Sequence, residues 1–545
     1  MKKGSLIAPL FFLALAFACL GSRLGAVALW ASAALALAIV FWAANADRGL
    51  LSSLSLPVLG YGVLVALNTL LLSPVYTPAG LYLPALLILA FLVARALGAY
   101  EGRAAALATL IAGAIIVAWG LIQFGLLGVA RAQSFLETPA IYAAVINLLL
   151  VPALALVLVG RRGALPLVVV PLAAAIFAAD SRGGYLALAA GLGFTAVFAI
   201  RAQLLKPRAL GLALASVAAG WIIATALRTS PSLQPEAAPT TEARAESTLS
   251  RLELYALSWA AWRERPLTGT GYLSYRYTLE QGRAQVPSYG KTSETWFVHN
   301  DYLQTLQELG PIGLAAFLGL ALFPPLLAYW RLPSVAIEQR PIVVAGAAAV
   351  STMSVHALVD FPFYVPICLL LYGAWLGALD RRLETIVRNP ILQWRSSPLL
   401  RVARAGALTL VVIALLRPVA AEAAAEWGLR KSAAGDGQIA AFWLGTAQRI
   451  EPKDWRYHWY AGRFWDAQAM QSGRREAAML AAEAFDAGFE ANPLEVKNLL
   501  GKISVHRRHR QLLDEPADDV TLRKWLAQAL ALAPMNPDVR REIAR

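Results

Sequence analysis

The sequence is poor in the residues that build disulfide frameworks and metal sites. It contains two cysteines and five histidines among 545 residues. Cys19 and Cys368 both lie in apolar stretches, which indicates neither a disulfide framework nor a metal site. Acidic residues are also scarce, with 34 Asp and Glu against 48 Lys and Arg. These scarcities exclude a disulfide scaffold and leave the hydrophobic and basic residues to be explained.

Hydrophobic residues make up 58% of the chain and the mean hydropathy is +0.56, which indicates a protein embedded in lipid. Crossing a bilayer core takes about 20 apolar residues in a helix. We therefore predict thirteen spans, at residues 6–20, 26–43, 54–72, 79–97, 104–122, 139–159, 164–179, 184–200, 209–227, 309–330, 341–358, 362–380 and 405–421. Lys2 and Lys3 precede the first span as in a signal peptide, but no A-x-A site separates it from the second, so we expect an uncleaved span.

The net charge of +14 suggests nucleic acid at first sight, but the distribution of the charges favours topology. With the N-terminus in the cytoplasm, the short cytoplasmic segments hold Lys2, Lys3, Arg48, Arg95, Arg103, Arg161, Arg162, Arg201, Lys206, Arg208, Arg331 and Arg340. Segment 381–404 adds Arg381, Arg382, Arg388, Arg395, Arg401 and Arg404. The short outer loops hold only Arg23, Arg131 and Arg182. This asymmetry follows the positive-inside rule, so the expected partner is the lipid bilayer and no nucleic acid.

Two parts of the chain are expected to lie outside the cytoplasm as soluble segments. The predicted organisation is spans 1–9 at residues 1–227, a periplasmic loop at 228–308, spans 10–13 at 309–421 and a periplasmic helical domain at 422–545. The fold class is therefore all-α, a polytopic bundle of about 12–13 spans. Residues 229–247 are rich in Pro, Ala, Thr and Glu, as in flexible segments.

A helix is predicted from Thr248 until Pro266 and the following glycines end it. In this helix Arg251, Tyr255, Trp259 and Trp262 recur on one face. In the C-terminal domain Pro452, Pro493 and Pro534 stand at probable helix starts, 41 residues apart. Such spacing predicts repeated helical hairpins of a tetratricopeptide-like kind, a class that commonly binds a partner protein or braces a neighbour.

His299 stands where the chain enters the tenth span, in "WFVHNDYLQTLQELGPIGL". Asn300 or Asp301 can cap the helix that begins here, and Gln304 can reach back to the cap. A helix N-terminus favours a neutral imidazole and attracts anions such as phosphate. His299 is therefore a candidate proton acceptor; the alternative is an interfacial histidine that only hydrogen-bonds locally.

Three arginines on the outer side are candidate phosphate ligands. Arg182, in the turn "AADSRGGYLAL", is costly at a membrane edge unless it is paired or functional, and a pair with Asp180 is the alternative. Arg251 heads the aromatic face of the loop helix, and its guanidinium suits bidentate phosphate binding; an interfacial arginine that snorkels is the alternative. Arg131 poses the same question, and a structural role is favoured there.

The outer loop also concentrates aromatic residues, which either stack on sugars or form an interfacial belt. They are Tyr255, Trp259, Trp262, Tyr272, Tyr275, Tyr277, Tyr289, Trp296, Phe297 and Tyr302. In "SVHALVDFPFYVP", His356 and Asp360 are four residues apart and can hydrogen-bond on one helical face. That pair either orients a catalytic histidine or stabilises the end of a span.

Taken together, these motifs resemble the O-antigen ligase superfamily over roughly residues 100–380. The order is "SRGG", then "RLELYALSWAAWRERPLTGTGY" in a large outer loop, then "HNDYLQTLQELGPIGL" and "HALVDFPFY". The resemblance implies a bacterial inner-membrane glycosyltransferase that moves a glycan from undecaprenyl diphosphate to an acceptor hydroxyl on the periplasmic face. It implies no nucleotide sugar, no cofactor and, as in the ligases, no metal.

The resemblance also implies site residues. Arg182 and Arg251 would bind the leaving diphosphate and His299 would activate or orient the acceptor hydroxyl. The residues expected near the substrate are Arg131, Trp259, Tyr272, Trp296, Asn300, His356 and Asp360. "QSFLETPAIYA" replaces the asparagine-rich turn of the family near 133–142, which puts the role of Arg131 in doubt.

The acceptor stays open between a lipid-linked glycan in a polymerase, lipid A-core in a ligase and a protein serine in an oligosaccharyltransferase. The thirteenth span and the C-terminal repeats favour a polymerase of O-antigen or exopolysaccharide. A non-enzymatic transporter of lipid-linked glycan and a pure scaffold are the alternatives from other classes, although transporters tend to place ionisable residues mid-span.

Overall fold

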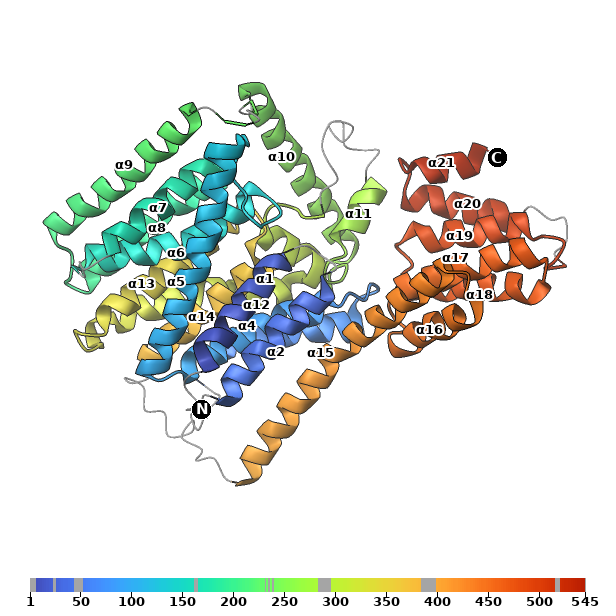
Figure 1. Ribbon diagram of the computed structural model, residues 1–545, viewed down its shortest axis with the longest axis horizontal. Helices are drawn as coiled ribbons and strands as arrows, with labels where there is room; N and C mark the ends of the chain where they lie inside the picture. Colours follow the sequence, from blue (N-terminus) through green and yellow to red (C-terminus); the bar gives the residue numbers. More distant parts are fainter. Residues whose placement is uncertain are drawn as a thin grey trace.

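A computed structural model describes residues 6–22, 26–43, 52–160, 165–230, 232–233, 236–237, 240–282, 296–383, 398–514 and 520–544. Within these ranges the chain forms 21 α-helices and no strand (Figure 1). Several basic or aromatic residues of the sequence prediction lie outside the described residues, namely Lys2, Lys3, Arg23, Arg48, Arg161, Arg162, Tyr289, Arg388 and Arg395. The all-α prediction is confirmed.

Thirteen helices, which we call the membrane unit, follow the thirteen predicted spans in order. They are α1 (Ile7–Leu20), α2 (Val27–Ala43), α3 (Ser55–Leu67), α4 (Ala79–Ala96), α5 (Ala99–Ile122), α6 (Pro139–Leu158), α7 (Leu165–Ala179), α8 (Arg182–Arg201), α9 (Pro207–Thr229), α12 (Asp301–Arg331), α13 (Arg340–His356), α14 (Pro366–Leu383) and α15 (Pro398–Ala433). Short π-helical turns extend α3 to Leu72 and α5 to Leu127.

Among the described residues, seven helical stretches are long and apolar enough to cross a bilayer. They are Ser55–Leu72, Ala79–Ala96, Ala99–Leu127, Pro139–Leu158, Arg182–Arg201, Pro207–Thr229 and Asp301–Ser334. Three more apolar helices, Ile7–Leu20, Val27–Trp42 and Leu165–Ala179, are shorter. The chain is thus a multi-pass membrane protein, and the full count of thirteen crossings stays a prediction.

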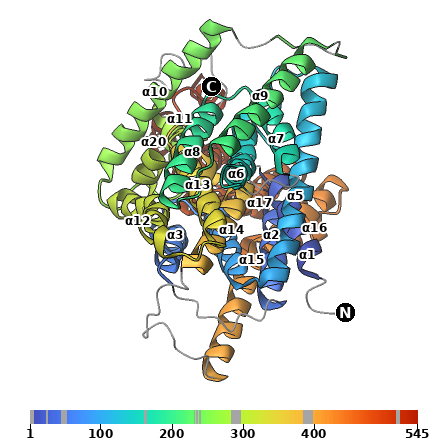
Figure 2. The same ribbon diagram turned by 90° about the vertical axis from the view of Figure 1, so that its left-hand side faces the viewer.

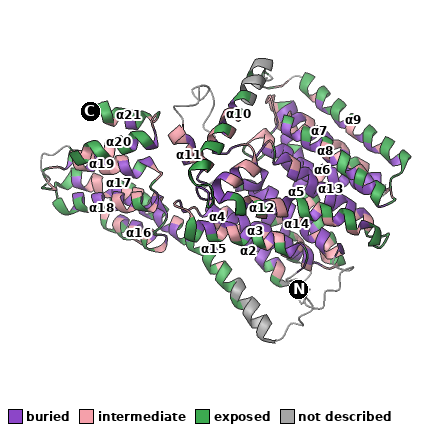
Figure 3. Cartoon of the chain, turned by 180° about the vertical axis from the view of Figure 1, so that it is seen from behind, coloured by how far each residue is buried: buried purple, intermediate pink, exposed green. Residues whose placement is uncertain are grey.

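The membrane unit has a centre of largely buried helices and a rim of exposed ones. In α6, 83% of the spanning residues are buried inside the protein, against 22% in α9 at the edge of the bundle. Figure 3 shows mostly buried residues around α6, α13 and α14, with α9 on the rim, and Figure 2 shows α13 and α14 in the middle of the bundle. Exposed Leu, Ile and Trp side chains of α9, such as Trp221 and Ile222, form the kind of apolar surface that lipid covers.

The outer loop carries two helices, α10 (Thr241–Glu264) and α11 (Tyr275–Gly282). Helix α10 begins seven residues before the predicted start at Thr248, inside the stretch predicted to be flexible. The prediction was wrong there because Thr240 provides an N-cap, with its hydroxyl accepting a hydrogen bond from Ala243 N at 3.2 Å. The predicted end is confirmed, since the helix stops just before Pro266.

Helix α12 is kinked at Gly310, whose φ of 69° and ψ of −171° are outside the helical range. The first part of the helix is polar and fully buried, through the side chains Asp301, Gln304, Thr305, Gln307 and Glu308. The apolar part starts at the kink, where the predicted span also starts. The polar residues before it lie inside the protein and not in lipid, which hydropathy cannot distinguish from a surface segment.

The glycine-rich run 265–271 of the outer loop packs against this kink. Thr270 N and Gly271 N donate hydrogen bonds to the carbonyls of Gln307 and Glu308 at 2.8 and 2.9 Å. These carbonyls belong to the last turn before the kink and have no partner within the helix. The two sequence runs with the strongest family resemblance are therefore bonded to each other.

The C-terminal residues form a stack of helices α16 (Gly437–Ile450), α17 (Trp455–Ser472), α18 (Arg475–Ala491), α19 (Val496–Arg508), α20 (Val520–Leu532) and α21 (Pro537–Ala544). Pro452, Pro493 and Pro534 each stand three residues before a helix start, at α17, α19 and α21. Two residues after each proline, the side chain of Asp454, Glu495 or Asn536 caps the new helix. The repeated helical starts are present, and the tetratricopeptide likeness remains a prediction.

Helix α15 joins the membrane unit to the C-terminal stack without a break, as Figure 1 shows. The predicted domain boundary between residues 421 and 422 falls within this helix. Its 36 residues correspond to about 54 Å, which exceeds the roughly 30 Å of a bilayer core. The stack also contacts the membrane unit directly, since Lys453 Nζ donates a hydrogen bond to Leu70 O at 2.9 Å.

Candidate functional site

His299 is held immediately before α12 in an unusual backbone conformation. Its φ is 59°, which is uncommon for a residue with a side chain. The Tyr255 hydroxyl of α10 donates a hydrogen bond to the His299 carbonyl at 3.0 Å. Asn300 caps α12 by accepting from Leu303 N at 3.0 Å, and Gln304 accepts from Val298 N at 3.0 Å. The predicted capping arrangement is present, with Asn300 as the cap.

The imidazole of His299 is bonded to a carboxylate 61 residues further along the chain. His299 Nδ1 lies 3.2 Å from Asp360 Oδ1, in the turn between α13 and α14. Burial raises the pKa of the Asp360 carboxyl, but the hydrogen bond from His299 and the positive charge of nearby Arg251 contribute to lowering it more, so the net pKa is below its ordinary value. An ionised Asp360 can only accept, so Nδ1 is the donor.

This assignment leaves Nε2 of a neutral His299 as a proton acceptor. The His299 side chain is 23% exposed and that of Asp360 is 5% exposed. A ligand can therefore reach the imidazole but not the carboxylate behind it. The arrangement is that of a histidine base oriented by a buried acid.

Asp360→Asn is expected to lower thermal stability at neutral pH and to have a smaller effect in acid. A carboxyl whose folded pKa lies below the ordinary value of 3.8 contributes stability above that value, and this contribution is lost as the pH falls through the folded pKa. The difference in melting temperature between wild type and variant should be constant from about pH 8 to about pH 5 and shrink below about pH 4. A difference that persists unchanged at about pH 3 contradicts the ionised state assigned to Asp360.

Arg251 reaches the same turn from the outer loop. Its Nη1 donates a hydrogen bond to Val359 O at 3.0 Å, next to Asp360. The inward face of α10 is fixed by the buried Leu254 and by Ser258, whose hydroxyl donates to Gln307 Oε1 of α12 at 2.7 Å. The loop helix is thus anchored on α12, and Arg251 brings a positive charge to the His299–Asp360 pair.

The turn that carries Arg182 packs on the other side of residues 356–360. Ser181 caps α8 by accepting from Gly184 N at 3.2 Å. A Cβ on Gly183 would lie 3.1 Å from a Val359 methyl and 3.3 Å from His356 Nε2. Arg182, the adjacent residue, is exposed at the helix start. The "SRGG" turn and "HALVDF" are therefore neighbours, although 170 residues or more separate them in the chain.

Arg131 lies beside that turn in a structural setting. Its Nε donates a hydrogen bond to Ala179 O at 3.3 Å, and Ala132 N donates to Ala178 O at 2.9 Å. These bonds hold the segment after α5 against the end of α7. They agree with the structural alternative for Arg131.

His356 is buried beneath the pair and not exposed to a ligand. Its side chain is 1% exposed, and its Nε2 is 3.9 Å from Asp360 Oδ2, which is too long for a hydrogen bond. The i,i+4 spacing suggested His356 as the partner of Asp360, but His299 approaches the carboxylate more closely, at 3.2 Å.

The three aromatic residues expected at the substrate occupy different surroundings. Tyr272 is 2% exposed and stacks on Tyr364 with ring centroids 5.4 Å apart, inside the protein. Trp259 is 46% exposed and contacts Trp262; it lies eight residues, about 12 Å, along α10 from Arg251. Trp296 is 39% exposed, and the guanidinium of Arg276 lies over its ring. Of these, only Trp296 is both accessible and close in sequence to His299.

Sequence reasoning missed the residues that hold the site together. Glu308 is fully buried. Its carboxylate accepts hydrogen bonds from the Tyr364 hydroxyl at 2.9 Å and from Tyr275 N at 3.3 Å. Asp301 accepts from Phe363 N at 2.9 Å, while its own N–H donates to Ala357 O at 2.8 Å. The sequence signal that could have found them is the pair itself: Asp301 and Glu308 are two acidic residues, seven apart, directly before a predicted span. Across the described part of the chain, no three His, Cys, Asp or Glu side chains are grouped to hold a metal ion.

Residues 167–318 match the family model described as O-antigen ligase. The match contains Arg182, Arg251 and His299 and ends before His356 and Asp360. No curated protein matches the chain by sequence.

Proposed function

Residues 167–318 carry an O-antigen ligase family domain, and from this premise we propose that the chain is a glycosyltransferase of the bacterial inner membrane. It transfers a glycan from undecaprenyl diphosphate to an acceptor hydroxyl on the periplasmic face. The observation that carries the proposal is the convergence of three sequence-distant segments. The Arg182 turn, Arg251 of the loop helix and His299 all meet residues 356–360.

In the proposed reaction the acceptor oxygen forms a bond to the anomeric carbon while the glycosyl–phosphate bond breaks. Undecaprenyl diphosphate leaves with the electron pair of that bond. Arg182 and Arg251 stabilise the charge that develops on its phosphates. His299 Nε2 takes the proton of the acceptor hydroxyl, and ionised Asp360 stabilises the resulting imidazolium as a positioning residue. The proposal uses no metal and no cofactor.

The ends of α8 support the proposed orientation. Arg182 at its start stands at the candidate site, and Arg201 at its end lies about 30 Å away. Near that far end Arg201 Nε donates to Tyr329 O at 3.3 Å, and Arg340 Nη1 donates to Ala202 O at 3.0 Å. Basic residues thus gather opposite the site, which the positive-inside rule assigns to the cytoplasm. The site and the C-terminal stack are then periplasmic.

We favour a polymerase of O-antigen or exopolysaccharide as the specific activity. The C-terminal stack and the additional helix α15 extend the core expected of a simple ligase. Transfer to lipid A-core is the second candidate and transfer to a protein serine the third. A non-enzymatic transporter of lipid-linked glycan is disfavoured because the ionisable residues gather at one end of the bundle.

The glycan that accumulates on undecaprenyl diphosphate in a deletion strain tests the choice of acceptor. If the protein is a polymerase, its deletion should leave single repeat units on the carrier. Mass spectrometry of the released glycans gives the chain lengths. Full-length chains on the carrier beside bare lipid A-core would establish a ligase instead. Unchanged carrier glycans would overturn both.

A further inference from the structure

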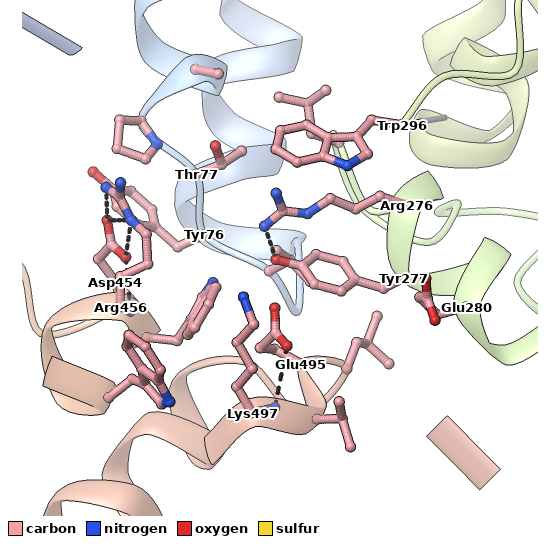
Figure 4. Close-up of a pocket in the computed structure, with 18 of the residues that line it drawn as sticks. Tyr76, Thr77, Arg276, Tyr277, Glu280, Trp296, Asp454, Arg456, Glu495 and Lys497 are labelled. Carbon is pink, nitrogen blue, oxygen red and sulfur yellow. Dashed lines mark hydrogen bonds and ion pairs between the residues drawn. The ribbon is translucent and has the colours of Figure 1, made fainter. Parts of the chain in front are cut away.

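A cavity lies between the membrane unit and the C-terminal stack. Its volume is about 480 Å³. Three parts of the chain provide most of its lining, namely residues 75–79 before and at the start of α4, helix α11 with Trp296, and the starts of α17 and α19; α2 and the end of α20 add the rest. Figure 4 shows side chains from all three pointing into the same space.

The charged groups of the cavity are balanced and engaged with one another. Its walls contain three basic side chains, Arg276, Arg456 and Lys497, and three acidic ones, Glu280, Asp454 and Glu495. Arg456 is bonded to Asp454, with Nη2 to Oδ2 at 2.7 Å. Arg276 bonds the Tyr277 hydroxyl and covers the Trp296 ring. A site for a diphosphate or another strong anion would need uncompensated positive charge, so this cavity suits a neutral polar ligand.

Aromatic and aliphatic side chains supply the remaining surface. Trp296 is 39% exposed, and Trp459 and Tyr460 are half-buried at the wall of the stack. Such rings combine a flat apolar face with a polar edge. A sugar ring has the matching chemistry, with C–H groups on its faces and hydroxyls at its rim, which the surrounding Arg, Lys, Asp and Glu side chains can hydrogen-bond. An acyl chain would leave those polar groups unsatisfied.

The position of Trp296 connects the cavity with the candidate site. Trp296 lines the cavity and His299 follows three residues later. Three residues of extended chain cover at most about 10 Å. The Cα atoms of Trp296 and His299 are therefore no more than about 10 Å apart.

We propose that this cavity binds several sugar units of the acceptor glycan and directs the acceptor hydroxyl of that glycan to His299. The inference rests on the proposed function for its substrate class, but binding can be measured without transfer. On this account the C-terminal stack is one wall of an oligosaccharide site that the membrane unit alone does not complete.

The test is binding of a defined probe to the purified full-length protein in lipid nanodiscs. The probe is an oligosaccharide ladder released by mild acid from the surface polysaccharide of the source bacterium and labelled at the reducing end. Its fluorescence anisotropy gives a dissociation constant. Trp459→Ala should weaken binding by about tenfold or more, as for aromatic contacts at other binding sites, and Trp459→Phe should recover most of it. Trp296→Ala, on the opposite wall, should weaken it comparably.

Trp427→Ala is the matched control, because Trp427 is an exposed tryptophan of α15 that does not line the cavity. It should bind the ladder as the wild type does. Wild-type affinity in both Trp459→Ala and Trp296→Ala overturns the proposal, as does binding of a lipid or peptide in the cavity that the ladder fails to displace. The transfer assay separates the two proposals: retained binding with lost transfer in His299→Ala supports both, whereas binding of the ladder by a wild type that transfers no glycan refutes only the proposed function.

Discussion

His299→Ala is expected to lower the rate of glycan transfer by about 10²- to 10⁴-fold, the usual contribution of a positioned general base. The variant loses the only imidazole of the site that a ligand can reach, since His299 is 23% exposed and His356 only 1%. Without this imidazole, the buried Asp360 has no group through which to assist removal of the proton from the acceptor hydroxyl. Transfer from a purified lipid-linked donor, measured with protein in nanodiscs, gives the rate directly.

His509→Ala is the control for this experiment. His509 Nε2 lies 2.8 Å from Asp466 Oδ1, so it also forms a histidine–aspartate pair, but in the C-terminal stack. Its removal should leave transfer close to the wild-type rate if the protein remains folded. Transfer that survives in His299→Ala would mean that the proposed mechanism is wrong, whereas a wild type that transfers no glycan would make a scaffold or transporter the better account.

Gly310→Ala is expected to destabilise the protein by about 3 kcal/mol. The φ of 69° and ψ of −171° at Gly310 lie in a region that essentially only glycine adopts, and a side chain there costs about 1–3 kcal/mol. A Cβ would also lie 2.3 Å from the backbone oxygen of Leu267, so the glycine-rich run 265–271 would have to move. Thermal unfolding followed by tryptophan fluorescence should show a clearly lower melting temperature.

Gly319→Ala serves as the matched control in the same helix. No atom lies within 4 Å of a Cβ built at Gly319, and its backbone is helical. Alanine should be neutral there or stabilise by up to about 1 kcal/mol. Equal melting temperatures for Gly310→Ala and wild type would show that the kink is not required for the packing of the outer loop.

The order of the membrane helices could be predicted because long apolar runs are a strong signal. Each predicted span coincides with a helix, and the predicted start at residue 309 matches the kink at Gly310. The polar residues 301–308 could not be placed in the same way. Asp301 and Glu308 are buried by hydrogen bonds to Phe363 and Tyr364, and these tertiary contacts leave no periodic trace in the sequence.

The members of the candidate site could be predicted better than their pairing. Arg182, Arg251 and His299 stood out by chemistry and by resemblance, and the structure brings the segments that carry them together. The partner of Asp360 was not predictable, because a spacing of four residues points to His356 while His299 is 61 residues away in the chain. Likewise, the hydrogen bond from Arg251 to the Val359 carbonyl involves a backbone group whose direction only the fold determines.

The bonding of the glycine-rich run to the kink sets an order of events during synthesis. Thr270 bonds Gln307, which is 37 residues later in the chain, and at about 5–20 residues per second the run waits roughly 2–7 s for its partner to leave the ribosome. Asp360 follows His299 by a further 61 residues, a delay of roughly 3–12 s. The outer loop is therefore synthesised before the helices that fix its shape, and the histidine–aspartate pair closes only after α13 is in place. A nascent chain stalled before residue 360 carries His299 without the carboxylate that orients it.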